Sequence, residues 1–173
     1  MKKTMKKLAV MMAMLALPLT IQAQTKFHDV EANEAHGAVK CIKSNVMGRD
    51  QIVTFTEDGK MQQEGLSDIV YDGDGYLKSA SMEAMGQKGS IKYIWENGRV
   101  KSTTVNMMGQ EIKSVYNYDE KGIVTSNSIN FGGQQVESPF TDYKFDDHGN
   151  WISRKTSMMG QTVEQNRTIE YYE

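Results

Sequence analysis

The sequence holds one cysteine, two prolines and three histidines, and these shortages exclude several kinds of protein. Cys41 has no partner for an internal disulfide, so we interpret it as a small apolar side chain in a strand. Pro139 cannot donate to a sheet ladder, and a bulge or a break in the sheet is expected beside it. After the first 23 residues no apolar run is long enough to cross a bilayer, so no membrane span is expected in the mature protein.

The segment 1–23 has the pattern of a secretory signal peptide. Four lysines precede the apolar run Leu8–Leu17, and Ala23 closes a region typical of a cleavage site. The predicted mature protein is residues 24–173, a single β-repeat domain that is exported to the periplasm or secreted. No cysteine follows the apolar run, so a lipid anchor is not expected.

Removal of this segment makes the chain acidic. The segment contains four of the 20 basic residues and none of the 22 acidic ones, so 16 basic and 22 acidic residues remain and the net charge is −6. Proteins that bind nucleic acids need clustered lysine and arginine. We therefore expect no nucleic-acid partner.

The rest of the chain repeats one motif: an aromatic residue, an acid, a short polar turn ending in glycine, and a second strand-like run. The copies are VYDGDGYLKS (70–79), IWENGRVKS (94–102), YDEKGIVTS (118–126) and FDDHGNWIS (145–153), with a weaker FTEDGKM (55–61). A second glycine turn lies between copies, as in Met85-Gly86-Gln87 and Met108-Gly109-Gln110. Each period holds two extended runs and two turns, so we interpret one repeat as one β-hairpin.

The turn residues predict how the hairpins pair. Asn97-Gly98 predicts a two-residue loop, and the other copies predict a three-residue loop in which the aspartate accepts turn amides. If Met-Gly-Gln is also a three-residue loop, the aromatic residues fall in one row on one face of the sheet. A second row on that face then alternates large and small side chains: Tyr93, Tyr116 and Tyr143 with Ser79, Ser102, Ser126 and Ser153.

These patterns predict an all-β fold, an antiparallel β-meander of repeated hairpins that forms a curled single sheet or an open, barrel-like one. Something must cover the apolar row, because a bare sheet would leave it in water. The sequence leaves open whether residues 24–66 are strands or contain a short helix. We favour additional strands, with Thr25–Ala38 as the place for a helix.

The repeats resemble the tyrosine-aspartate (YD, or Rhs-type) repeat family. The best match, Tyr143-Lys144-Phe145-Asp146-Asp147-His148-Gly149-Asn150-Trp151, follows that family's aromatic-x-Tyr/Phe-Asp-x-x-Gly-Asn pattern, and the likeness covers roughly residues 66–173. The chain also looks like short exported proteins of uncharacterised function. Because large members of the family use such repeats as shells or scaffolds, the resemblance implies a structural role.

Three groups of residues suggest chemistry, and each has a simpler interpretation. His28, His36 and His148 would bind zinc only if they converged with a carboxylate, and otherwise are solvated. The acids of 72–76 suggest calcium, but their spacing fits a hairpin turn better. The methionine pairs suggest copper(I), but turn packing explains them. We therefore expect no metal, no cofactor and no enzyme.

The aromatic row is the one candidate binding site. Trp95, Tyr118, Phe145 and Trp151 would stack on sugar rings if they were exposed. The leading hypothesis is a non-catalytic exported β-repeat scaffold or interaction protein of the cell envelope. The alternatives are a glycan-binding module that uses this row and, third, a hydrolase. A protein partner or a second copy would bind a sheet edge or the apolar stripe, because a meander leaves two edges unpaired.

Overall fold

The computed structural model describes residues 27–46, 49–158 and 160–173, so the predicted signal peptide lies outside the described residues. This part of the chain contains twelve strands and one short helix, α1 (Asp29–Ala32). The strands are β1 (Val39–Val46), β2 (Arg49–Phe55), β3 (Met61–Gln62), β4 (Leu66–Tyr71), β5 (Leu77–Ala84), β6 (Gln87–Glu96), β7 (Arg99–Met107), β8 (Gln110–Tyr118), β9 (Val124–Phe131), β10 (Gln134–Phe145), β11 (Trp151–Met158) and β12 (Gln161–Tyr171).

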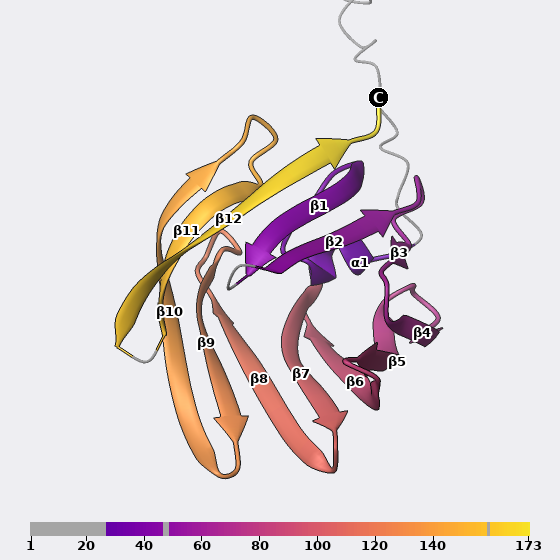
Figure 1. The fold of residues 1–173 in the computed structure, drawn as a ribbon. Coiled ribbons are helices and arrows are strands. Elements are labelled where there is room, and N and C mark those ends of the chain that lie inside the picture. Colours follow the sequence, from indigo (N-terminus) through magenta and orange to yellow (C-terminus); the bar gives the residue numbers. More distant parts are fainter. Residues whose placement is uncertain (1–26, 47–48, 159) are drawn as a thin grey trace, which may run out of the picture.

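All twelve strands belong to one antiparallel sheet in the order β3-β2-β1-β12-β11-β10-β9-β8-β7-β6-β5-β4 (Figure 1). Strands β4 to β12 form a meander, and β1 to β3 join it beside β12 rather than beside β4. The sheet therefore curls into a nearly closed barrel with one unsealed seam between β3 and β4. This confirms the predicted all-β meander in its barrel-like form, and residues before β4 supply both strands and a short helix.

The turns alternate between the two ends of the sheet. The Asp-turn end carries the turns at 56–60, 72–76, 97–98, 119–123 and 146–150, and the Met-turn end carries those at 85–86, 108–109 and 132–133. As predicted, each aspartate of the motif accepts turn amides: Asp146 Oδ1 accepts from the N–H groups of His148 and Asn150 at 3.0 and 2.9 Å. These bonds hold each turn in one shape.

The predicted three-residue Met-Gly-Gln loop is wrong. Ala84 pairs with Gln87, so the loop has two residues, and the extra residue lies in a β-bulge at the other end of the hairpin. There, Trp95 pairs with Val100. The next pair skips one residue on β7, because Ile94 pairs with Ser102. Such a bulge adds one residue to one strand only.

The bulge preserves the first predicted row and overturns the second. The two-residue loop and the one extra residue in the bulge together equal the three residues that the prediction placed in the loop. The aromatic residues therefore still share a face. Beyond the bulge the faces exchange, and Tyr93 pairs with Thr103 while Tyr116 pairs with Asn127. The serines of the second row therefore lie at bulges, not opposite the tyrosines. The bulge or break expected at Pro139 does not lie there: β10 runs through this residue as one strand, with a change of paired partner from β9 to β11, and its register shift begins after Thr141.

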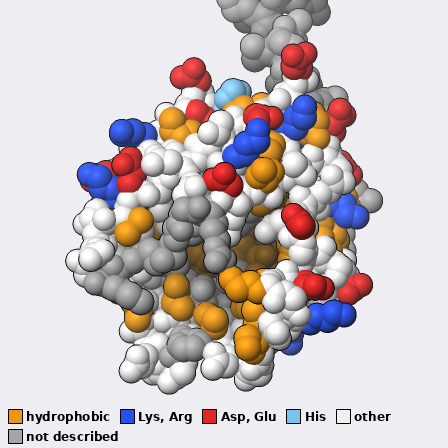
Figure 2. Space-filling view, in the orientation of Figure 1, with side chains coloured by type: hydrophobic (Ala, Val, Ile, Leu, Met, Phe, Trp, Pro, Cys, Tyr) orange, Lys and Arg blue, Asp and Glu red, His pale blue; other side chains and the backbone are white. Residues whose placement is uncertain are grey.

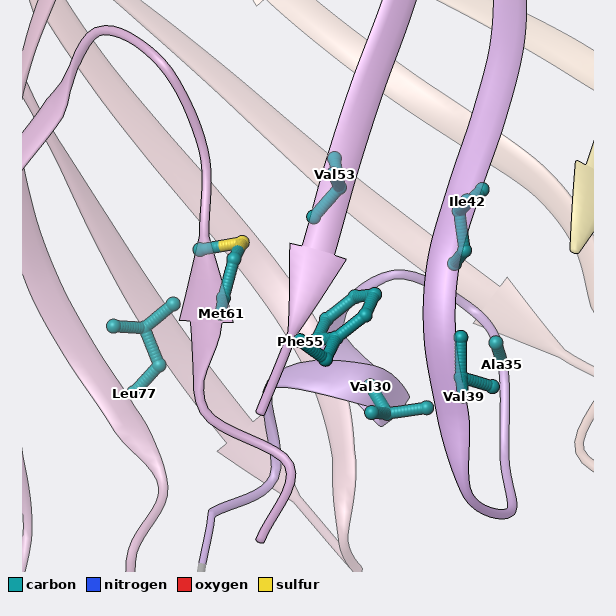
Figure 3. Close-up of a cluster of buried hydrophobic side chains, with 8 residues drawn as sticks. All are labelled: Val30, Ala35, Val39, Ile42, Val53, Phe55, Met61 and Leu77. Atoms are coloured by element: carbon teal, nitrogen blue, oxygen red, sulfur yellow. The ribbon is translucent and has the colours of Figure 1, made fainter. Parts of the chain in front are cut away.

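The hydrophobic core lies at the Asp-turn end, around α1. Its buried members come from α1, the segment that follows α1, and strands β1, β2, β3 and β5 (Figure 3): Val30, Ala35, Val39, Ile42, Val53, Phe55, Met61 and Leu77. Met61 and Leu77 belong to opposite sides of the seam, so side chains close the seam at this end. Burial of each large member contributes about 1.5–3 kcal/mol.

The turn tips at the Met-turn end combine exposure with strain. Met85 and Met108 occupy the first turn position at φ 52 and 54, and their side chains are 82% and 73% exposed. Left-handed backbone costs an ordinary L-residue about 1–2 kcal/mol, and asparagine tolerates it better. Nothing in the fold explains methionine there.

We expect Met108→Asn to raise the free energy of unfolding by about 0.5–1 kcal/mol, because asparagine relieves the left-handed strain. Urea unfolding followed by circular dichroism measures it. Met107→Asn, one residue earlier in β7, is the control and should lower stability. A destabilised Met108→Asn variant would contradict this account of the turn.

Candidate functional site

Residues 27–38, which include α1, fill the Asp-turn end of the curled sheet, and we call this segment the plug (Figure 1). Backbone hydrogen bonds tie it to the rim at several places. Phe27 N–H donates to the carbonyl of Asp58 and His28 N–H to that of Gly75, each at 3.2 Å. The carbonyl of Ala38 accepts from Tyr172 N–H at 2.8 Å. The plug is thus bonded to turns on both sides of the seam and to the end of the chain.

The sheet can hold the plug because neighbouring hairpins separate at this end. The ladders that join one hairpin to the next stop at Ser79, Ser102 and Ser153, short of the turns. Carbonyl groups beyond these points have no strand partner, and side chains bond them instead. Trp95 Nε1 donates to Leu77 O at 2.7 Å, Tyr118 Oη to Val100 O at 2.8 Å, Tyr143 Oη to Val124 O, and Arg167 Nε to Trp151 O at 2.6 Å.

The four aromatic residues predicted as a site therefore share a face, but they do not form one platform. Trp95, Tyr118 and Trp151 are half-buried inside the curl, and Trp95 packs against the core and the ring of Tyr76. Phe145 is 44% exposed and stacks on Tyr143 at a centroid distance of 5.7 Å. The structure brings only Tyr118 and Trp151 together at one cavity.

This cavity, the turn-end pocket, has a volume of about 250 Å³ and lies between the plug and the turns of the β6–β7, β8–β9 and β10–β11 hairpins. It combines two rings with acidic and basic groups. Its chemically distinctive lining residues are Glu31, Glu34, His36, Arg99, Tyr118 and Trp151. Arg99 lies over the ring of Tyr118, with its guanidinium carbon 5.6 Å from the centroid.

Two buried arginines anchor the plug beside this pocket. Arg154 forms an ion pair with Glu34, and Arg167 donates to the carbonyls of Asn33 and Glu34 at 2.9 and 2.7 Å. The ring of Trp151 lies between the two guanidinium groups, 4.1 and 3.8 Å from their carbons. Burial lowers the pKa of Arg167 to about 10, so it remains charged at neutral pH. A buried cation without partners would be costly, so these bonds fix the plug in place.

Asn150 makes the second anchor. It is fully buried, accepts from His36 N–H at 2.9 Å and donates to His36 O at 2.9 Å. Next to it, Tyr171 Oη donates to Asp146. Burial acts to raise the pKa of Asp146, but hydrogen bonds from Tyr171 and from two backbone N–H groups outweigh it and hold the pKa below its ordinary 3.8.

The three histidines do not converge on one carboxylate, although His28 Nδ1 lies 3.8 Å from Glu31 Oε2. His36 Nε2 bonds the carbonyl of His148 at 2.9 Å, and the ring of His148 stacks on Tyr171. His28 stacks on Tyr76. In the described ranges no group of three or more His, Cys, Asp or Glu residues has the arrangement of a metal site.

Asp29 joins the two edges of the seam. Its side chain is fully buried, and Oδ2 accepts from Met61 N–H on β3 and from Tyr71 Oη on β4, both at 2.7 Å. Burial raises the pKa of Asp29 above 3.8, although these two hydrogen bonds oppose the rise. Sequence reasoning missed this residue. The only signal was an acid inside the apolar-flanked stretch Thr25–Ala38.

At the Met-turn end the seam is open. A cavity of about 820 Å³, the seam cavity, lies among residues 50–52 of β2, residues 63–65 and residues 83–86 at the end of β5. Strand β3 is only two residues long, so among the described residues 49–53 of β2 pair with β1 alone and β4 pairs with β5 alone. The edge of β2 therefore borders this cavity with unpaired backbone groups, and residues 63–65 lead from the cavity to the unpaired edge of β4.

The inner wall at this end is apolar. Ile91, Val105 and Ile112 pair across β6, β7 and β8 on the face that carries Trp95, and they are half-buried. Figure 2 shows this side of the molecule hollowed below β2, with hydrophobic side chains gathered over β7 to β9. The two ends of the curled sheet thus differ: one is filled by the plug and the other is open.

Comparison with known proteins adds no identity: no protein-family model matches this chain, and no curated protein is similar to it. Within the part of the chain that the structure describes, no helix has the length and apolar character needed to cross a membrane.

The anchor at Asp146 predicts a pH dependence. Its pKa in the folded chain lies below 3.8, so its carboxylate stabilises the fold fully above pH 3.8, and this stabilisation is lost as the pH falls through the folded pKa. Urea unfolding between about pH 2 and 6 should show a shallower decline for Asp146→Asn than for the wild type. Asp147→Asn, on the exposed next residue, is the control and should keep the wild-type slope. Equal slopes for all three proteins would contradict the assignment.

Proposed function

We propose that the protein is a non-catalytic, exported β-repeat scaffold or interaction protein of the cell envelope. One observation carries this proposal: the sheet leaves two unpaired strand edges beside an open seam, and free edges are a common means of recognising other polypeptides. The charged groups around the plug support the non-catalytic part of this proposal, because the carboxylates of Asp29, Glu34 and Asp146 are all engaged in bonds to the protein's own residues.

The sequence supports the proposed location of the protein, its scaffold role and the class of its partner. The segment 1–23 has the signal-peptide pattern, without a following cysteine for lipid attachment, which favours the periplasm or the exterior of the cell. The resemblance of residues 66–173 to YD repeats favours a scaffold, since that family uses its repeats structurally. The mature chain carries a net charge of −6, which disfavours nucleic acid as the partner.

Photo-crosslinking in cells tests this proposal. The full chain carries p-benzoylphenylalanine at exposed Ile52 beside the seam or at exposed Lys113 on the outer wall. We expect the mature chain to begin near Gln24 in the exported fraction and to form a discrete adduct with another protein or with a second copy. An uncleaved chain in the cytoplasm, or a lack of adducts at both positions, would refute the function.

A glycan-binding module is the second candidate, and the turn-end pocket favours it. Aromatic rings beside charged and polar groups suit a sugar ring, and Tyr118 and Trp151 line this pocket next to Arg99 and Glu31. Arg154 and Arg167 lie over the ring of Trp151, so Tyr118 is the ring on which a sugar would stack. The pocket of about 250 Å³ would accept a single ring rather than a row of sugars.

Calorimetric titration with soluble mono- and oligosaccharides tests the glycan hypothesis. Binding should weaken by about tenfold or more in Ile123→Trp, whose larger side chain fills the turn-end pocket. Ile94→Trp is the matched control, because Ile94 is exposed on the outer face and does not line this pocket. Sugars that bind both variants equally, or bind neither the variants nor the wild type, would remove this candidate.

A further inference from the structure

We propose that the open half of the seam binds one extended, basic segment of a partner polypeptide, which adds to the sheet as a strand between β2 and β4. The proposal rests on the proposed function as an interaction protein, and it names the surface and the chemistry of the partner.

Strand directions define how the partner runs. Strands β2 and β4 both run from the Met-turn end to the Asp-turn end, because each leads into a turn at 56–60 or 72–76. In an antiparallel sheet, one strand of opposite direction belongs between two strands that run the same way. Strand β3 takes that position, but for two residues only, at the Asp-turn end. The rest of the position is open to a strand from another chain.

Backbone groups and space are both available there. Among the described residues, the outer edges of β2 at 49–53 and of β4 at 66–71 have no strand partner. The N–H of Leu66 already donates to Gln63 O, and the other outward N–H and C=O groups can bond an incoming backbone. The seam cavity of about 820 Å³ is lined by residues 50–52 of the β2 edge, by residues 63–65, which lead into β4, and by residues 83–86. A strand rises about 3.3 Å per residue, so a segment of about four or five residues matches the unpaired stretch of β2.

The charge of the cavity selects the partner. Asp50, Glu64 and Glu83 line it, and none of its described lining residues is lysine or arginine. Ile52 and Val70, on the two edge strands, are 53% and 49% exposed. A segment in which lysine or arginine alternates with apolar residues would pair with the acids and cover these two side chains.

A second copy of the chain fits this surface less well. It would present its own β2 or β4 edge, and these edges carry Asp50 and Asp68, so like charges would meet across the new pairing. Asp68 also has a left-handed backbone, φ 48, where the β4–β5 register shifts, and such irregularity opposes pairing of two identical edges. A basic strand from another protein would meet neither a like charge nor an irregular backbone along β2.

Selection from a phage-displayed library of random peptides of about twelve residues, against the folded mature protein, tests the proposal. We expect the enriched peptides to contain several lysines or arginines and to lack a central proline. Glu83→Lys should weaken the affinity for the best peptide by about tenfold. Glu111 is an exposed acid of β8 outside the cavity, and Glu111→Lys should change this affinity by less than about twofold.

Hydrogen exchange then locates the peptide. Bound peptide should slow the exchange of backbone amides within 49–53 and 66–71, while those of β8 keep their rate. Absence of enrichment, enrichment of acidic peptides, or protection at another surface would overturn the seam site. A chain that instead dimerises in sedimentation with protection of the same edges would also overturn it, in favour of a second copy. An adduct from Lys113 but not from Ile52 in the crosslinking experiment would keep the interaction function and reject the seam.

Discussion

The structure depends on how it satisfies backbone carbonyls where its hairpins separate. Each bulge ends the ladder between neighbouring hairpins before the Asp-turn end, and a buried carbonyl without a partner is costly. Trp95, Tyr118 and Arg167 supply the missing bonds from the next hairpin. The aromatic residues of the repeat are therefore hydrogen-bond donors as well as apolar surface, which explains why Trp and Tyr occupy these positions and why the sheet can widen around the plug.

The widening produces the difference between the two ends. At the Asp-turn end, Arg167 and Asn150 fix the plug, and Asp29 joins both edges of the seam. At the Met-turn end the ladders between hairpins are complete, and none of the described segments fills that end as the plug fills the other. The seam is therefore closed at the Asp-turn end, where charged and apolar groups meet beside β3, and open at the Met-turn end, which short β3 does not reach. Stability and the proposed recognition thus belong to different halves of one sheet.

Local patterns predicted most of the sheet. The aspartate turns, the Asn97-Gly98 loop and the pairing of Trp95 with Val100 follow from turn chemistry over a few residues. The bulges could not be predicted, because a three-residue loop and a two-residue loop with a bulge contain the same number of residues. The plug was missed for another reason. The partners of Asp29 are Met61 and Tyr71, which lie 32 and 42 residues away in the chain, and no local signal marks them. Of the predicted site, Tyr118 and Trp151 share a cavity, while Trp95 and Phe145 lie elsewhere.

The pairing of β1 with β12 has a consequence for how the molecule forms. Ile42 pairs with Ile169, so strands near the two ends of the chain meet in the finished sheet. The hairpins from β4 onward can form from neighbouring residues, whereas this contact needs the whole polypeptide and carries the largest loop-closure entropy. Of the described strands β12 is synthesised last, so β1 can pair with β2 early but gains its second partner only when β12 emerges. Closure of the ring of strands is thus the slow, late event of folding, and truncation of the last strand would release the first three.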